Sequence, residues 1–143
     1  MRPRCREHKD GILPSILRFA VYRTGPSERH LANLGAKILK PQLGPDYVNR
    51  LRALSNEVPG MAAYCVYWIR RANDHLPPCT AADPVAGRAG LVGTQNIRNN
   101  ASRVGGLDPV ATSGTIVEAV DNQPWSGEAN VHVSIANWVK TQE

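Results

Sequence analysis

Two segments near the C-terminus alternate their side chains with the period of a β-strand, and the short connection between them limits the possible folds. The first comprises residues 115–120 and the second residues 131–136. Parallel strands need a crossover of roughly a dozen or more residues, usually a helix, and residues 121–128 are too few for one. We therefore predict that the chain ends in an antiparallel pair of strands.

A third strand and two helices are predicted upstream of this pair. Residues 89–94 are a brief apolar run, typical of a strand that is buried on both faces. The clearest helix spans residues 60–76, where apolar side chains recur three and four positions apart until two prolines follow. A shorter helix starts at Pro45 and ends before Pro59. Together these elements predict an α/β layer whose final strand is antiparallel.

The helix over residues 60–76 carries Tyr64 and Trp68 on its apolar face. Their simplest role is packing in the core, because aromatic rings bury a large apolar surface. An aromatic stripe of this kind can also line a cofactor pocket, and that alternative stays open.

The composition fits one domain and excludes a membrane span. The chain has 143 residues, of which 42% are hydrophobic, as in ordinary globular domains. Its richest apolar run, residues 61–69, ends at two arginines and falls short of the roughly 20 apolar residues that cross a bilayer. Charged residues interrupt any apolar stretch near the start, so we predict no targeting peptide and a cytoplasmic location.

The positive charge is concentrated toward the N-terminus. Residues 1–52 hold 11 Lys plus Arg and 4 Asp plus Glu, a net +7, whereas residues 53–143 hold 6 and 8, a net −2, which together give the +5 of the chain. This asymmetry suits a polyanionic partner such as DNA, and solvated side chains on a disordered arm would produce the same pattern. We interpret residues 1–33 as a basic, poorly ordered arm, with at most a short strand or helix at Ile16–Tyr22. The stable part is expected to begin near residues 37–44.

The sequence completes no common catalytic or metal-binding motif. It contains three scattered cysteines, Cys5, Cys65 and Cys79. Their odd number and wide spacing predict reduced thiols and no zinc site. It also contains four isolated histidines, His8, His30, His75 and His132. None has the local partner of a general base, and we expect His132 to be a surface or hydrogen-bonded side chain on its strand.

A polar run follows the apolar strand over residues 89–94. It contains five polar side chains, Gln95, Asn96, Arg98, Asn99 and Asn100. In open α/β sheets ligands bind beyond the carboxyl ends of the strands, so this run is a candidate site. The alternative is a solvated turn in which asparagine side chains cap the next helix.

Four strings of the sequence are long and specific: Leu34-Gly35-Ala36-Lys37, Ala86–Arg98, Gly114–Val120 and Gln123–Ile135. They resemble the methyltransferase region of large restriction-modification proteins of the MmeI-like type. Those enzymes methylate the exocyclic amine of adenine in DNA. The resemblance extends from about residue 34 to residue 142 and implies that residues 34–143 are part of a DNA methyltransferase domain.

The resemblance implies a class I, Rossmann-like fold that uses S-adenosylmethionine. Such a sheet has seven strands, helices on both faces and an antiparallel final strand. The strand containing Leu91–Thr94 would lie between an upstream parallel strand and that final strand. A Gly-containing turn after the first strand holds S-adenosylmethionine, and an Asn-Pro-Pro-aromatic motif after the fourth holds the flipped adenine.

This chain departs from the family at both motifs. Immediately before Leu34, where the Asn-Pro-Pro-aromatic motif is expected, residues 30–33 are His-Leu-Ala-Asn, and Asn33 falls at the place of the aromatic. The residues farther upstream are too few for the strands and helices that carry the cofactor. The resemblance therefore implies a truncated C-terminal part of the catalytic domain, inactive alone. It implies no catalytic residue here, and S-adenosylmethionine binding only in the complete enzyme.

One position of the family's site is retained at Trp125, in the loop before the final strand. The resemblance implies that this ring stacks on the flipped base, an interaction of about 1–3 kcal/mol, and the alternative is packing at the end of the sheet. The implied partners are DNA and a complementary N-terminal methyltransferase fragment. Two other classes stay open: a small basic DNA-binding or interaction module without catalysis, and a remnant that folds poorly.

Overall fold

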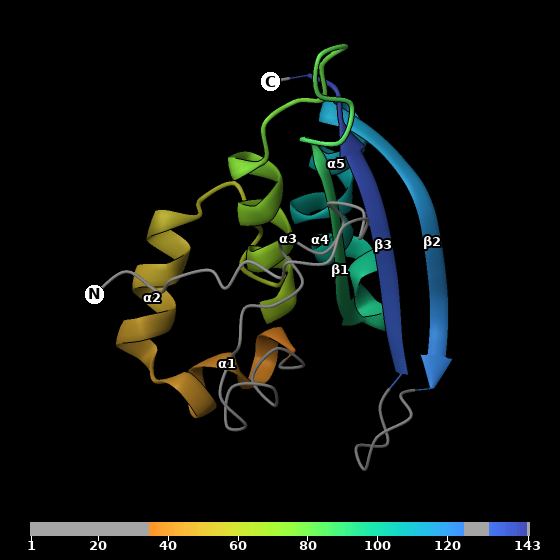
Figure 1. The fold of residues 1–143 in the computed structure, drawn as a ribbon. Coiled ribbons are helices and arrows are strands. Elements are labelled where there is room, and N and C mark those ends of the chain that lie inside the picture. The colour runs from red at the N-terminus through yellow and green to blue at the C-terminus, as the bar shows by residue number, and fades with distance from the viewer. Residues whose placement is uncertain (1–34, 125–131, 143) are drawn as a thin grey trace, which may run out of the picture.

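The computed structural model describes residues 35–124 and 132–142, which form an α/β fold (Figure 1). Three helices come first, followed by a strand, three short helical segments and two strands. In chain order the elements are α1 (Ala36–Leu43), α2 (Pro45–Leu54), α3 (Tyr64–His75), β1 (Arg88–Thr94), the 3-10 helix η3 (Gln95–Arg98), α4 (Asn100–Gly105), α5 (Leu107–Ser113), β2 (Gly114–Pro124) and β3 (His132–Lys140).

The strands form one sheet in the order β1-β3-β2. The last strand, β3, lies in the middle and runs antiparallel to both neighbours, so β1 and β2 point in the same direction. The predicted antiparallel pair at the C-terminus is confirmed, although β3 continues beyond the predicted end to Lys140. The strand predicted over residues 89–94 is also confirmed, and its partner is β3, with Leu91 opposite Ala136.

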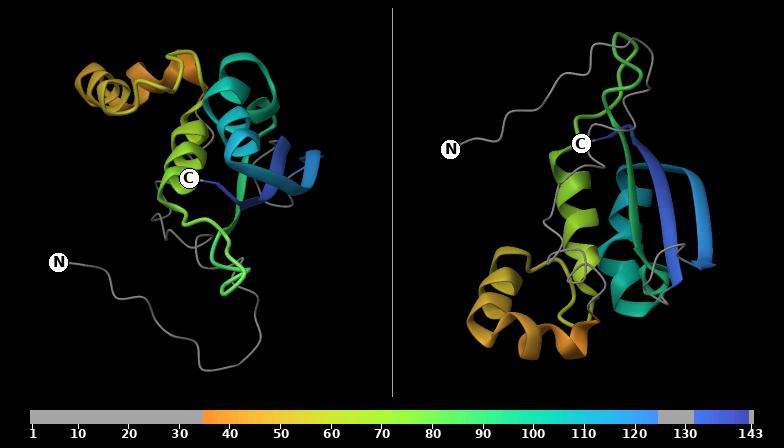
Figure 2. Two further views of the ribbon diagram at one scale, coloured as in Figure 1. Left: turned by 90° about the horizontal axis from the view of Figure 1, so that it is seen from above. Right: turned by 60° about the horizontal axis from the view of Figure 1, so that its bottom comes forward.

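Helices α3 and α5 pack against one face of this sheet (Figures 1 and 2). The other face carries an apolar row with one side chain from each strand, because the register sets Val92 and Val120 opposite Ile135. We call these three residues the open-face row. Val92 is 47% exposed, so the prediction that this strand is buried on both faces is wrong within the described residues.

The core lies between α3 and the sheet, and its largest fully buried side chain is Trp138, only 1% exposed. Tyr64 is buried as predicted, but Trp68 is 41% exposed, so the prediction that Trp68 packs in the core is wrong. The reason is the rotation of α3. The line of α3 that meets the sheet contains Cys65 and Asn73, whereas Trp68 lies on the side that faces α2.

The helix predicted to start at Pro45 is confirmed as α2, whereas the sequence pattern does not predict α1. Gly44 separates the two helices with φ +83°, a left-handed conformation that favours glycine. At the other end of α2, the Arg52 guanidinium donates a hydrogen bond of 2.7 Å to the carbonyl oxygen of Gly60. This bond ties α2 to the turn that precedes α3.

The basic arm predicted over residues 1–33, including the short strand or helix at Ile16–Tyr22, lies outside the described residues. The predicted start of the stable part can be compared with the structure. The first described helix, α1, begins at Ala36, close to the predicted start near residues 37–44. None of the helices in the described part of the chain has the length and apolarity needed to span a membrane.

Candidate functional site at the carboxyl ends of β1 and β2

Three segments of the chain meet at one end of the sheet. They are the turn after β1, the end of β2 and the start of β3. The polar run predicted as a candidate site lies here, and its five polar side chains, Gln95, Asn96, Arg98, Asn99 and Asn100, are all exposed. The run folds as η3 and the beginning of α4.

The one apolar residue of the run, Ile97, fixes the turn against the sheet. Its side chain is buried, and its Cγ2 atom would lie 2.6 Å from a Cβ placed on Gly93. The backbone of Gly93 is therefore close enough to Ile97 that only glycine fits without a shift. With Ile97 turned inward, the polar side chains on both sides of it are directed to solvent.

The carboxylate of Asp121 links the three segments. One of its oxygens pairs with the guanidinium of Arg98 from η3, and the other accepts a hydrogen bond of 2.9 Å from the Ser134 hydroxyl of β3. Both oxygens are thus engaged, and Asp121 ties the end of β2 to its two neighbours. Asp121 and Ser134 are absent from the sequence-based candidates, because only the register of the hairpin brings them beside Arg98.

A second polar pair lies beside this carboxylate. The His132 ring nitrogen Nδ1 and the Asn122 side-chain oxygen share a hydrogen bond of 2.8 Å, and both residues are exposed. The prediction for His132, a surface or hydrogen-bonded histidine, is confirmed. Asn122 has φ +53°, a left-handed conformation that asparagine tolerates better than most residues.

The alternative interpretation, in which asparagine side chains cap the next helix, does not hold at the start of α4. Asn99 is the N-cap residue of α4, but its side chain makes no capping hydrogen bond. Asn100, the first residue of that helix, has φ +41°. The exposed amides of this run are therefore not used to start the helix, and they stay available at the edge of the site.

Of the two thiols among the described residues, Cys65 lies beside the end of β1 and is buried. The Cys65 sulfur lies 3.8 Å from the Thr94 hydroxyl, and burial raises the pKa of the Cys65 thiol above its ordinary value. Cys79 is partly buried and donates to the carbonyl oxygen of Pro84. Within residues 35–124 and 132–142, no three His, Cys, Asp or Glu side chains are grouped as metal ligands.

The described residues at this end do not fit S-adenosylmethionine. The turn after β1 has no glycine between Gln95 and Arg98, and Ile97 fills its inner side, so it offers no open backbone cradle. What the cluster does offer is a set of hydrogen-bonding groups around one fixed carboxylate. Trp125, the one site residue implied by the resemblance, lies outside the described residues, directly after Pro124 of β2.

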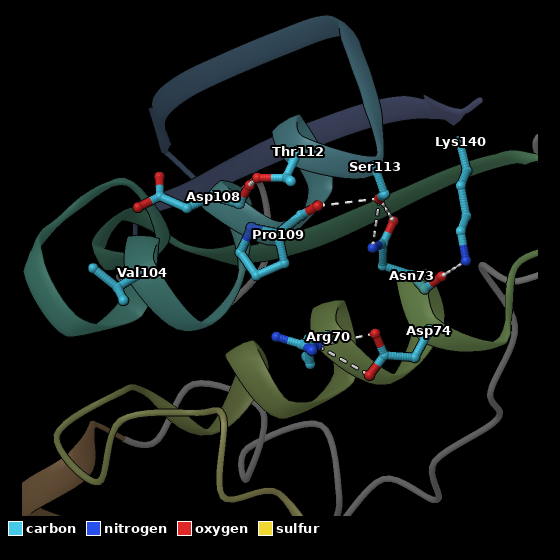
Figure 3. A pocket seen from close by; sticks show the side chains of 9 residues that line it. All are labelled: Arg70, Asn73, Asp74, Val104, Asp108, Pro109, Thr112, Ser113 and Lys140. Atoms are coloured by element: carbon cyan, nitrogen blue, oxygen red, sulfur yellow. Dashed lines mark hydrogen bonds and ion pairs between the residues drawn. The ribbon is translucent and has the colours of Figure 1, made fainter. Parts of the chain in front are cut away.

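A hollow of about 430 Å³ lies at the opposite end of the sheet, between α3 and α5 (Figure 3). Two of its charged side chains, Arg70 and Asp74, pair with each other at 2.9 Å, and the Lys140 ammonium donates to the backbone oxygen of Asn73. Asp108, which also lines the hollow, pairs with Arg103, so each charged group of the lining has a structural partner. The hollow lies at the amino ends of β1 and β2, away from the end where α/β sheets bind ligands.

No protein-family model, no curated protein and no solved structure matches this chain. A relation to methyltransferases therefore depends on the sequence strings described above and on the arrangement of the strands.

Proposed function

We propose that residues 34–143 are the C-terminal part of the catalytic domain of an adenine-specific DNA methyltransferase of a restriction-modification system. The observation that supports this most is the strand order β1-β3-β2. The final strand lies antiparallel beside the strand that contains Leu91–Thr94, and this is the neighbour that the resemblance implies for it. On this proposal the sheet is one part of a larger class I sheet in a cytoplasmic enzyme.

The exposed edge and the exposed face of the sheet also support the proposal. Among the described residues β1 has one strand neighbour, so its outer backbone groups have no sheet partner there. The open-face row is apolar, although no described helix covers it. A parallel strand beside β1 and a helix over the row would bury both, and the cofactor half of a methyltransferase supplies elements of these kinds.

The proposal divides the reaction between the two halves. The complementary N-terminal fragment would hold S-adenosylmethionine, which supplies the methyl group. It would also hold the adenine amine through its Asn-Pro-Pro-aromatic motif. This chain would form one wall of the base site. Asp121, fixed by Arg98 and Ser134, holds the base of the loop that contains Trp125, whose ring would stack on the flipped adenine.

Fragment complementation tests this function. The chain is co-expressed with an N-terminal methyltransferase fragment that carries both missing motifs, and methyl transfer to adenine in DNA is measured with radiolabelled cofactor. We expect a stable complex that methylates DNA and no transfer by the chain alone. Failure of the halves to associate, or an inactive complex, would count against the proposal.

A matched pair of variants locates the contact. Val92→Asp places a charge on the open face and should abolish complementation. Val117→Asp makes the same change at an exposed position of β2, away from the β1 edge, and should leave it intact. Equal effects of the two variants would show that the halves do not meet at Val92.

The second candidate function is a basic DNA-binding or interaction module without catalysis. The described part of the basic segment supports it, because Lys37, Lys40 and Arg50 are exposed on α1 and α2. A gel-shift titration over salt separates the two functions. Phosphate contacts made by the chain alone would give an affinity for DNA that falls steeply as salt increases.

A further inference from the structure

A groove of about 310 Å³ lies between α2 and α3, which stand beside each other in Figure 1. Its lining includes Tyr47 and Leu51 of α2 and Tyr64, Tyr67, Trp68 and Arg71 of α3. This volume is at the lower end of the range of small-molecule sites, and the lining combines aromatic rings with a few polar groups, as such sites do. The methyltransferase proposal assigns no role to this groove.

The aromatic rings of the groove brace one another. The hydroxyl oxygens of Tyr47 and Tyr64 lie 2.8 Å apart in a hydrogen bond that joins the two helices. The Tyr64 ring meets Trp68 edge to face, with centroids 6.0 Å apart and an angle of 78° between the planes. Tyr47 is nevertheless 45% exposed, so a fixed ring is presented at the mouth of the groove.

The Tyr67 hydroxyl is an independent sign of a ligand. Tyr67 is only 5% exposed, and among the described residues its hydroxyl has no hydrogen-bond partner. Burying a hydroxyl without a partner is unfavourable, so native proteins rarely do so without a reason. A polar atom of a ligand bound in the groove would supply the missing partner.

The charged side chains at the rim leave one arginine for a ligand. Arg70 is held by the carboxylate of Asp74 through two hydrogen bonds of 2.9 and 3.0 Å. Arg71, the next residue, is exposed and makes no ion pair within the described part of the chain. Glu57 also lies at the rim, so the rim carries both signs of charge. The positive charge is confined to the position of Arg71 and does not extend over a basic surface.

We propose that this groove binds the nucleobase of a nucleotide. The base stacks on the Tyr47 ring, a polar atom of the base pairs with the Tyr67 hydroxyl, and the phosphate contacts the Arg71 guanidinium. Two sources share this chemistry, a free mononucleotide and a single-stranded nucleic acid. The site is separate from the carboxyl-end site and does not depend on the methyltransferase proposal.

Calorimetry on the full chain tests this site with adenosine, adenosine monophosphate and a short oligodeoxyadenylate. Tyr67→Phe should weaken all three about three- to tenfold, the loss expected for one hydrogen bond. The same variant should melt at the same or a higher temperature, because it removes a buried hydroxyl that has no partner among the described residues. Opposite effects on binding and stability are not expected of a purely structural tyrosine.

Arg71→Gln should weaken the monophosphate and the oligonucleotide and leave adenosine unchanged. Arg103→Gln, on α4 and paired with Asp108, is the matched control and should change none of the three. If the monophosphate binds, a free nucleotide is a sufficient ligand. If only the oligonucleotide binds, the ligand is a single-stranded nucleic acid. No binding of either, or binding that Tyr67→Phe does not weaken, would overturn the proposal whatever the outcome of complementation.

Discussion

The indole nitrogen of Trp138 donates a hydrogen bond of 3.1 Å to the side-chain oxygen of Asn73. Both residues are almost completely buried, so this bond joins the central strand to the helix that covers it inside the core. The Ser113 hydroxyl, at the end of α5, also pairs with the Asn73 amide. One asparagine thus connects α3, α5 and β3.

Replacing this asparagine should be costly. Asn73→Ala leaves the buried indole N–H of Trp138 without an acceptor, and such a loss typically lowers the free energy of unfolding by about 1–3 kcal/mol. Urea denaturation measures the change. The neighbouring Asp74→Ala removes only a surface ion pair and should cost less than about 1 kcal/mol. Equal losses for the two variants would contradict a special role for Asn73.

Glycine is required at position 93. A Cβ there would approach the Ile97 side chain to 2.6 Å, so Gly93→Ala should destabilise the protein by about 1–3 kcal/mol through overpacking. In an Ile97→Ala background the same substitution should cost clearly less, because the clashing methyl group is gone. Gly60→Ala, whose Cβ would meet no atom closer than 3.7 Å, serves as the control in thermal melts.

The buried Cys65 thiol should be protected from alkylation. Because burial raises its pKa above the ordinary value of 9.0, we expect iodoacetamide at pH 8 to modify Cys79 well before Cys65. Peptide mapping measures the order, and urea should abolish the difference.

The same raised pKa makes stability depend on pH. The neutral thiol is favoured in the folded state, so its contribution is complete below pH 9.0, the ordinary pKa, and is lost as pH rises through the higher folded value. Cys65→Ala should remove this contribution to the loss of stability at alkaline pH. A decline of the same size in the variant would assign it to other groups.

The isolated chain should self-associate. Within the described residues, the outer edge of β1 has no strand partner and the open-face row has no helix over it, a combination that promotes association. Light scattering should find species larger than a monomer, and both Val92→Asp and the complementary fragment should reduce them. A monodisperse monomer with one cooperative thermal transition would show that the chain closes its own sheet.

The isolated chain should not bind S-adenosylmethionine. The turn after β1 is closed by Ile97, and no described residues form the glycine-rich turn that receives this cofactor. Calorimetry should detect no heat of binding for the chain alone. Stoichiometric binding at micromolar concentration would mean that a different cofactor site exists.

The sequence predicted the three strands, α2 and α3, but not α1, α4 or α5, and it did not predict which side of α3 faces the sheet. The hairpin follows from a connection too short for a helix, and α3 from a regular apolar period that ends at paired prolines. The pattern does not distinguish Trp68 from Trp138 as the core tryptophan, because that depends on how α3 is rotated against the sheet. Position 138 also lies beyond the predicted end of its strand.

The candidate site was predictable only in part. The run over residues 95–100 follows from the general rule that ligands bind beyond strand ends. The carboxylate that organises the site does not, because the pairing of β2 with β3 shifts twice, between Ile116 and Glu118 and between Val120 and Gln123. Such irregularities decide which side chains meet, and nothing in the local sequence specifies them.

Those two register shifts also affect which edge of the sheet can pair with a strand of another copy. Both register shifts place an extra residue in β2, as β-bulges do. Bulges bend and twist a strand, so the outer edge of β2 is a poor template for another strand. The opposite edge, β1, pairs with β3 in continuous register from Arg88 to Thr94. Within the described residues, the sheet therefore has one regular edge that can pair with another strand and one bulged edge that pairs poorly. Copies that pair edge to edge through β1 leave only the bulged edge of β2 among the described strand edges, so growth by strand addition should end at pairs and not extend into fibres.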